Sequence, residues 1–243
     1  LTAKRYVAEL SEHKARARRI TPLLKYFAAE KTVEITRRCV QIHGGSGYTR
    51  DYCAEKLLRD AMVMPIYEGT SQIQALMAMK DTLGGIIKNP QAFVRRLAQA
   101  QWRARSARDP LERRLARIKS LSLRAQQYLM TKTATQKVKA LRGRPISEWP
   151  TRFLKDWNPK RDFAYAMLHA ERLTKLLTDE LVCELFFEQA ERFPERRQLL
   201  ERYSERAEPR AYQLYREITT TGQGLLDRLA QADAGRNSER QSA

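Results

Sequence analysis

The feature that most constrains the fold of this chain is its long stretches of helix-forming residues with very few breakers between them. Ala, Leu, Arg, Glu and Gln are abundant, whereas only 10 Gly and 9 Pro occur in 243 residues. Within these stretches apolar residues recur every three to four positions, which is the period of a helix with one buried face. Alternating Val, Ile, Thr and Tyr, the usual strand pattern, is scarce. The sequence therefore predicts an all-α fold.

Glycine and proline divide the chain into a series of expected helices. Thr21-Pro22 fits an N-cap followed by proline at the first helical position, and GGSG at 44–47 is a strong stop signal. Gly84-Gly85 and then Asn89-Pro90 mark the next boundary. We therefore expect helices over 1–20, 22–42, 51–59, 70–83, 91–107, 111–141, 162–192 and 195–230, loops at 66–69 and 143–159, and a disordered tail at 232–243.

The positive charge of the chain is concentrated in its middle. The net charge is +18, and residues 88–161 alone hold 20 Lys and Arg against 4 Asp and Glu, a net +16. Residues 1–87 carry +5 (14 against 9), and residues 162–243 carry −3 (12 against 15). Such a block attracts phospholipid headgroups, nucleic acid or CoA phosphates. The alternative is a solvated helix face that the acidic last third partly neutralises, and the sequence leaves both open.

The cysteines and histidines form no metal-binding or disulfide pattern. The three cysteines, Cys39, Cys53 and Cys183, are far apart, and none of the three histidines is spaced with another ligand. We expect no metal site and a reducing compartment, which fits a cytoplasmic protein. The sequence has no apolar run of about 18 residues, the length that predicts a membrane span. It begins at Leu1 within an expected helix, so we expect a fragment of a longer protein.

Two glycine-containing turns stand about 25 residues apart in the first third of the chain. The first is QIHGGSGY at 41–48, and the second is IYEGT at 66–70, where a carboxylate precedes a glycine. Glycines let a backbone approach a flat or phosphorylated ligand. We expect Thr70 to be the N-cap of the next helix, whose free N–H groups suit an anion. On residue types alone, two helix–helix turns with glycine caps are the simpler interpretation. A cofactor site with a general base is the alternative.

The same segments resemble the signature of a known enzyme family. QxxGGxGY at 41–48, ExxxRD at 55–60 and IYEGTxxIQ at 66–74 are similar in order and spacing to motifs of the acyl-CoA dehydrogenase C-terminal domain. The resemblance covers about residues 1–85. It implies a C-terminal helical bundle at 1–87, which in full-length members follows an N-terminal helical domain and a middle β-domain. A basic helical extension at 88–231 would follow, as in large bacterial members.

The resemblance also implies roles for particular residues. Glu68 would be the base that removes the α-proton of an acyl-CoA thioester, and Tyr67 and Gly69 would lie against the substrate. The β-hydrogen would pass as hydride to FAD, giving a trans-2-enoyl-CoA in fatty-acid β-oxidation. Arg59 and Asp60 are expected to form a structural ion pair, and His43 also reads as a packing or capping residue. The residues implied to contact FAD are Gln41, Ile42, His43, Gly44, Gly45, Thr70, Ser71 and Gln72.

Partners follow from the same resemblance. It implies a homodimer or homotetramer with the FAD site across the subunit interface, and electron-transfer flavoprotein as the electron acceptor. An acyl-CoA oxidase-like enzyme, which passes electrons to oxygen, is one alternative. A non-catalytic helical family member associated with DNA or with a membrane is the other.

Three roles stay open for the extension, and we favour the first. It packs domains or subunits together, it lies on an anionic membrane through residues 88–161, or it binds nucleic acid through Arg-rich helices with Trp102, Tyr128 and Trp149. A membrane role would place the protein on the inner membrane face. The sequence contains no nucleic-acid recognition motif.

Overall fold

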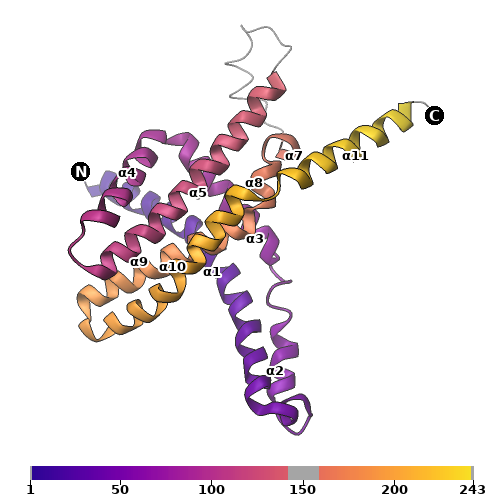
Figure 1. The fold of residues 1–243 in the computed structure, drawn as a ribbon. Coiled ribbons are helices and arrows are strands. Elements are labelled where there is room, and N and C mark those ends of the chain that lie inside the picture. The colour runs from indigo at the N-terminus through magenta and orange to yellow at the C-terminus, as the bar shows by residue number, and fades with distance from the viewer. Residues whose placement is uncertain (1, 142–158, 242–243) are drawn as a thin grey trace. The chain divides into compact units, whose positions relative to one another are not determined.

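The computed structural model of the protein describes residues 2–141 and 159–241, and within these ranges every regular element is a helix (Figure 1). This confirms the prediction of an all-α fold. The chain divides into two compact units, Leu1–Gly85 and Ile86–Ala243. The division falls two residues before the boundary that the sequence predicted after residue 87.

The helices of the two units are as follows. The first unit holds α1 (Thr2–His43), the 3₁₀-helix η1 (Gly44–Tyr48), α2 (Ala54–Ala61) and α3 (Ser71–Lys88), whose last residues belong to the second unit. The second unit continues with α4 (Pro90–Ser106), α5 (Pro110–Leu141), α7 (Pro159–Asp162), α8 (Ala164–Leu168), α9 (Ala170–Arg192), η3 (Pro194–Arg196), α10 (Arg197–Thr220) and α11 (Gln223–Gln241). The predicted loop at 143–159 lies, except for Pro159, outside the described residues, as does Trp149.

Helix α1 does not end at Thr21-Pro22, so the predicted start of a new helix there is wrong. Proline lacks the N–H that would bond the carbonyl four residues earlier, which costs roughly 3 kcal/mol in a helix interior, although its fixed φ is itself helical. The turns that follow bury Leu23, Tyr26 and Ala29, each at 6% exposure or less. Burial of this face contributes roughly 1.5–3 kcal/mol for each large apolar side chain. It therefore outweighs the local penalty.

Helix α3 likewise runs through Gly84-Gly85, which the sequence predicted as a boundary. Two glycines in a helix interior cost roughly 1 kcal/mol each relative to alanine, and the neighbouring Leu83 is fully buried. The helix ends before Asn89, at the boundary that the sequence predicted from Asn89-Pro90. The Asn89 side chain accepts a hydrogen bond from the Ala92 N–H at 3.1 Å, and Pro90 occupies the first helical position.

In the first unit, α1 is the long helix on which the other elements lie. After η1 reverses the chain, α2 packs back along the C-terminal part of α1 (Figure 1). Two side-chain contacts tie α3 to α1: Ser71 donates to Glu30 at 2.6 Å, and Arg18 forms a two-pronged ion pair with Asp81 at 3.0 Å. Because the earlier residue of α3 contacts the later residue of α1, these helices run antiparallel. The loop at 62–70 therefore lies partway along α1.

The second unit is built around α5. This helix packs against α4, α9 and α10, and its central apolar residues are fully buried. α4 lays its apolar face against the same helix, with Leu123 as the shared contact. The main core residues of this unit are Phe93, Leu97, Ala100, Ile118, Leu123, Leu129, Leu173, Leu176, Ala207 and Ile218.

The single helices predicted over 162–192 and 195–230 are each interrupted. Phe163 and His169 separate α7, α8 and α9, and Thr221-Gly222 separates α10 from α11. Gly222 has φ +94, and a Cβ there would lie 2.9 Å from the His169 ring. Both the backbone conformation and the close contact favour glycine at this corner.

Helix α11 continues to Gln241, whereas the sequence predicted a disordered tail from residue 232. Residues 232–241 contain one glycine and no proline, and Ala, Arg, Glu and Gln make up most of the rest. These residues favour a helix, and no strong breaker ends it before Gln241.

Candidate functional site

The predicted base, Glu68, lies in the loop of residues 62–70 between α2 and α3. The loop closes on itself, because the Ser71 N–H donates to the Pro65 carbonyl at 2.9 Å. Thr70 then caps α3, as predicted: its hydroxyl oxygen accepts a hydrogen bond at 3.3 Å from the N–H three residues later. The loop is thus a folded turn that leads directly into a helix.

Glu68 and Gly69 both have a left-handed backbone. Glu68 has φ +48 and Gly69 has φ +92, and Glu68 is the only non-glycine residue with positive φ in the part of the chain that the structure describes. Holding a residue with a Cβ in this region costs roughly 1–2 kcal/mol, and such strain gathers at functional sites. The Glu68 side chain itself is exposed.

Gln74 of α3 holds this strained turn from one side. Its amide Nε2 donates to the Glu68 carbonyl at 3.4 Å, and its side chain is largely buried. A Cβ at position 69 would lie 2.5 Å from the same Nε2. A side chain at residue 69 would therefore displace the amide that bonds the Glu68 backbone.

Helix α1 holds the loop from the other side. The Lys25 ammonium donates to the Met64 carbonyl at 3.1 Å and lies 3.8 Å from the centroid of the Tyr67 ring. One turn further along α1, Glu30 accepts the hydrogen bond from the Ser71 hydroxyl. The loop is therefore anchored to α1 on both sides of Glu68.

The first glycine turn ends α1, as the sequence predicted. Gly44 has φ +62, which suits the residue after a helix end. Gly47 is buried, and a Cβ there would lie 2.7 Å from the Val40 carbonyl, so only glycine fits. His43 bonds the Cys39 carbonyl one turn earlier on α1 through Nδ1 at 2.9 Å. The predicted FAD-contacting residues from Gln41 to Gly45 are all exposed.

The structure brings the predicted site residues together in two clusters rather than one. Tyr67 to Gln72 form the loop cluster, and Gln41 to Gly45 form the turn cluster. The loop cluster meets α1 at Lys25 and at Glu30, which are 16 and 11 residues before Gln41. At a rise of 1.5 Å per residue, these contacts lie about 17–24 Å from the turn cluster along α1.

Large apolar side chains are exposed beside both clusters. Ile42 and Tyr48 are 84% and 83% exposed at the glycine turn, and Ile66 is 65% exposed in the loop. Clusters of exposed apolar side chains of this kind mark surfaces that contact a ligand or another protein.

Other sequence predictions can be placed directly. Arg59 and Asp60 are both exposed and do not form the ion pair that we expected. Within the described ranges, no three His, Cys, Asp or Glu side chains gather as metal ligands would. Among the helices that the structure describes, none has the length and hydrophobicity that a membrane span needs.

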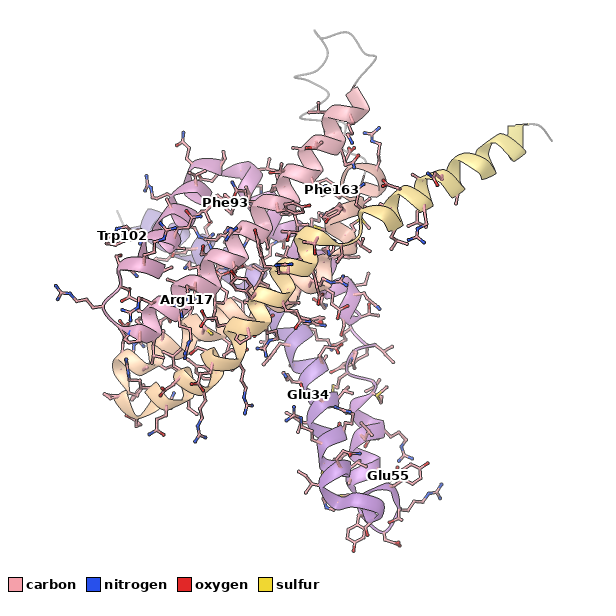
Figure 2. All side chains as sticks on the ribbon, viewed as in Figure 1. Glu34, Glu55, Phe93, Trp102, Arg117 and Phe163 are labelled. Atoms are coloured by element: carbon pink, nitrogen blue, oxygen red, sulfur yellow. The ribbon has the colours of Figure 1, made fainter. Side chains whose placement is uncertain are left out.

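The cations of α5 pair with acidic residues of α9 and α10. Arg114 and Arg117 (Figure 2) both bind Glu208 of α10, and Lys119 binds Glu184 of α9. The acidic last third of the chain therefore neutralises part of the basic block, which is one of the two alternatives that the sequence left open. The outer face of α4 differs, because this helix contains no acidic residue and exposes Trp102 at 67% beside Arg95 and Arg105.

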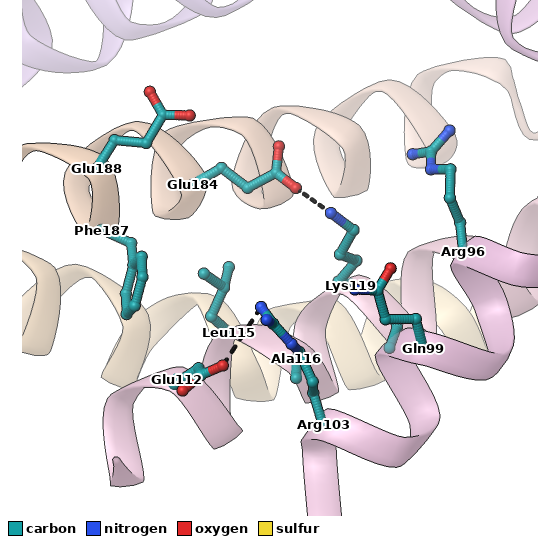
Figure 3. Close-up of a pocket in the computed structure, with 11 residues that line it drawn as sticks. Arg96, Gln99, Arg103, Glu112, Leu115, Ala116, Lys119, Glu184, Phe187 and Glu188 are labelled. Atoms are coloured by element: carbon teal, nitrogen blue, oxygen red, sulfur yellow. Dashed lines mark hydrogen bonds and ion pairs between the residues drawn. The ribbon is translucent and has the colours of Figure 1, made fainter. Parts of the chain in front are cut away.

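A pocket of about 310 Å³ lies between α4, α5 and α9 (Figure 3). Arg103 pairs with Glu112 across it at 3.4 Å, and Lys119 pairs with Glu184. The matched charges offer an anionic ligand such as CoA no excess positive charge. The charged lining residues are Arg96, Arg103, Lys119, Glu112, Glu184 and Glu188.

The comparison with protein families agrees with the motifs. The model of the acyl-CoA dehydrogenase C-terminal domain matches residues 1–83, which contain both clusters. Residues 1–83 are therefore similar to the C-terminal domain of acyl-CoA dehydrogenases. The matched segment is nearly the whole of the first compact unit.

Curated relatives match the same part of the chain. An acyl-CoA dehydrogenase of Bacillus subtilis is 51% identical over 63 residues, which are 26% of this chain and 17% of that protein. The 3-(aryl)acrylate reductase of Clostridium sporogenes is 48% identical over 61 residues (25% and 16%). The caffeyl-CoA reductase-Etf complex subunit CarC of Acetobacterium woodii is 43% identical over 70 residues (29% and 18%). The chain therefore spans less than a fifth of the length of these relatives.

A solved structure shares the fold over a longer part of the chain. The acyl-CoA dehydrogenase of Bacillus anthracis, solved in complex with FAD, aligns with a TM-score of 0.59 at 17% identity, covering 86% of this chain and 34% of that one. Because the first unit ends at Gly85, this coverage extends into the helices of the second unit. The extension thus has a counterpart in fold within an acyl-CoA dehydrogenase.

Sequence reasoning did not single out the residues that anchor the loop. Gln74 lies within the IYEGTxxIQ motif, so the motif contained it without giving it a role. Lys25 lies 43 residues before Glu68 in an amphipathic helix, where no local signal distinguishes it from other surface lysines.

Proposed function

We propose that the protein containing this chain is an FAD-dependent acyl-CoA dehydrogenase in which Glu68 removes the α-proton of the acyl-CoA thioester. The observation that carries the proposal is the Glu68 backbone, held at φ +48 between anchors from α1 and α3. A fold that retains such strain fixes the backbone from which the carboxylate extends, and a general base must be held near the proton that it removes. The match of residues 1–83 to the acyl-CoA dehydrogenase C-terminal domain supports the same assignment.

The residue types suit this chemistry. The α-proton beside a thioester is a very weak acid, so its removal needs a carboxylate positioned within hydrogen-bond reach. Tyr67 and Gly69 flank Glu68 and would lie against the acyl-CoA, where the absence of a side chain at Gly69 allows close approach. FAD would accept the β-hydrogen as hydride, and the product would be a trans-2-enoyl-CoA.

Both clusters fit contact with FAD. At Gly44 and Gly45 nothing lies within 4 Å of where a Cβ would be, so the backbone there is open to a flat ligand. Thr70, Ser71 and Gln72 begin α3, whose N-terminal end suits the pyrophosphate of FAD. The exposed Ile42 adds apolar surface beside the glycine turn.

The separation of the clusters supports a site shared between two subunits. Because about 17–24 Å of α1 lies between them, the turn cluster of one copy would complete the site of its partner. We therefore propose a homodimer or homotetramer. Electron-transfer flavoprotein is the proposed electron acceptor, in keeping with the Etf complex named for the Acetobacterium woodii relative.

The proposed substrate class is the acyl-CoA esters of fatty-acid β-oxidation, and the proposed location is the cytoplasm. Relatives named as reductases of aryl acrylates and caffeyl-CoA share the matched segment, so the test includes saturated and unsaturated thioesters. We further propose that the second unit packs domains or subunits together. Its support is the pairing of Arg114, Arg117 and Lys119 with acidic residues of the same unit.

Glu68→Gln in the full-length protein tests the proposed base. The amide keeps the shape of the side chain but cannot accept the proton, so we expect normal FAD content and at least about 1,000-fold slower bleaching of the flavin by acyl-CoA. Anaerobic stopped-flow absorbance measures this rate. Glu34→Gln, which removes a partly exposed carboxylate of α1 that pairs with Lys31 and Arg38 (Figure 2), is the matched control and should bleach normally. Normal bleaching in Glu68→Gln would show that the base is another residue.

A further inference from the structure

We infer that Lys25 of α1 is a positioning residue for the loop that carries Glu68, an inference that rests on the proposed function. The Lys25 side chain makes two contacts with this loop and is half-buried there. Both contacts involve residues that come shortly before Glu68 along the chain. Lys25 does not need to touch the substrate to act in this way.

The two contacts fix different parts of the loop. The hydrogen bond from the ammonium to the Met64 carbonyl, at 3.1 Å, holds the backbone at the start of the turn. The position of the same ammonium 3.8 Å from the Tyr67 ring centroid holds the side chain immediately before Glu68. A hydrogen bond from a charged donor is stronger than a neutral one, and a cation over an aromatic ring adds to it. One side chain thus restrains the backbone and the ring together.

Because Glu68 is strained, these contacts also hold it in a conformation that it would otherwise leave. A residue with positive φ returns to an ordinary conformation when its surroundings release it. Gln74 holds the Glu68 carbonyl from α3, and Lys25 holds the preceding residues from α1. Without Lys25, the chain before Glu68 can move while the carbonyl stays bonded, so the carboxylate would swing away from the position where it meets the substrate. The effect should fall on the rate of proton removal more than on substrate binding.

Lys25→Met and Lys25→Arg in the full-length FAD-bound protein test this role. Methionine keeps most of the length and the apolar stem but loses the charge and the donor, whereas arginine can donate to a carbonyl and stack on a tyrosine ring. We expect Lys25→Met to slow anaerobic flavin bleaching at saturating acyl-CoA by about tenfold or more, with the substrate Kd changed by less than about threefold. Lys25→Arg should recover most of the rate. Lys31→Met, at an exposed position of the same helix, should bleach at the wild-type rate.

The outcomes separate this inference from the proposed function. Wild-type bleaching in Lys25→Met, or a rate in Lys25→Arg no better than in Lys25→Met, overturns the positioning role. Glu68→Gln is measured beside them, and normal bleaching in that variant overturns the proposed base itself. Should Lys25→Met yield no FAD-bound protein, Lys25→Gln replaces it, because glutamine keeps a neutral donor. The rate should then fall between those of Lys25→Arg and Glu68→Gln, and equal rates in Lys25→Gln and Lys25→Arg would overturn the inference.

Discussion

His169 in the second unit shows how burial of one side chain makes stability depend on pH. The ring is fully buried, its Nε2–H donates to the Thr221 carbonyl at 3.2 Å, and its Nδ1 has no hydrogen-bond partner in the part of the chain that the structure describes. Burial is the main cause that lowers the pKa of His169 below its usual 6.5, and Arg172 adds to this effect, whereas the hydrogen bond to Thr221 and the charge of Glu217 oppose it. The folded chain therefore binds this proton less readily than the unfolded chain. The stability from His169 is complete above about pH 6.5 and is lost as the pH falls below it.

His169→Gln tests this pH dependence. The variant should be less stable than the wild type by about 1–3 kcal/mol at neutral pH, because the Thr221 carbonyl and the tight corner at Gly222 lose their partner. Its free energy of unfolding should nevertheless fall less than that of the wild type between about pH 7.5 and pH 5.5, since the titrating group is gone. Urea unfolding at the two pH values measures both quantities. His13→Gln, at an exposed position, is the control, and an equal pH dependence in wild type and His169→Gln would contradict the account.

At the scale of elements, the ion pairs between α5 and α10 argue that these helices are built to pack together. Glu208 is 24% exposed and accepts from both Arg114 and Arg117, so its loss leaves two partly buried cations without their partner. We expect Glu208→Gln to lower the free energy of unfolding by about 1 kcal/mol, a value kept small because Arg117 is 43% exposed. Urea unfolding measures the change, and Glu205→Gln on the exposed face of the same helix should have almost no effect.

The same variants separate packing from membrane binding. If the basic helices packed only within the protein, neither the wild type nor Glu208→Gln would float with anionic liposomes at physiological salt. Flotation of the wild type with anionic but not neutral liposomes would instead favour a lipid surface. The outer face of α4, with Trp102, Arg95 and Arg105, would then be the first place to substitute.

For the whole molecule, the separation of the two clusters along α1 predicts complementation between inactive subunits. Glu68→Gln removes the proposed base, and Gly45→Trp should fill the open backbone beside the proposed FAD. In a mixed dimer, the site formed by Glu68 of one copy and the glycine turn of the other remains intact. Equal co-expression of the two variants should therefore restore about a quarter of the wild-type activity per site, because half of the dimers are mixed and each has one intact site. Flavin bleaching of the mixture, compared with each variant alone, measures this, and no recovery would place both clusters of a site in one subunit.

The sequence by itself determined the features that depend on neighbouring residues. The all-α class followed from composition and period, and the start of α4 followed from the boundary predicted at Asn89-Pro90. The sequence also predicted the glycine stop after α1, the Thr70 cap and the family signature, since each is a short pattern of neighbouring residues.

Only the tertiary structure decided the features that depend on residues far apart in the chain. Pro22 and Gly84-Gly85 were predicted as boundaries, yet burial of nearby residues carries α1 and α3 through them. The contact of Lys25 with the Glu68 loop joins positions about 40 residues apart, and the pairing of α5 with Glu208 joins positions about 90 apart. Local helix propensity cannot predict such contacts, because they contribute energy only after the helices have packed. The division of the predicted site into two clusters has the same origin, since it follows from the length of α1 between them.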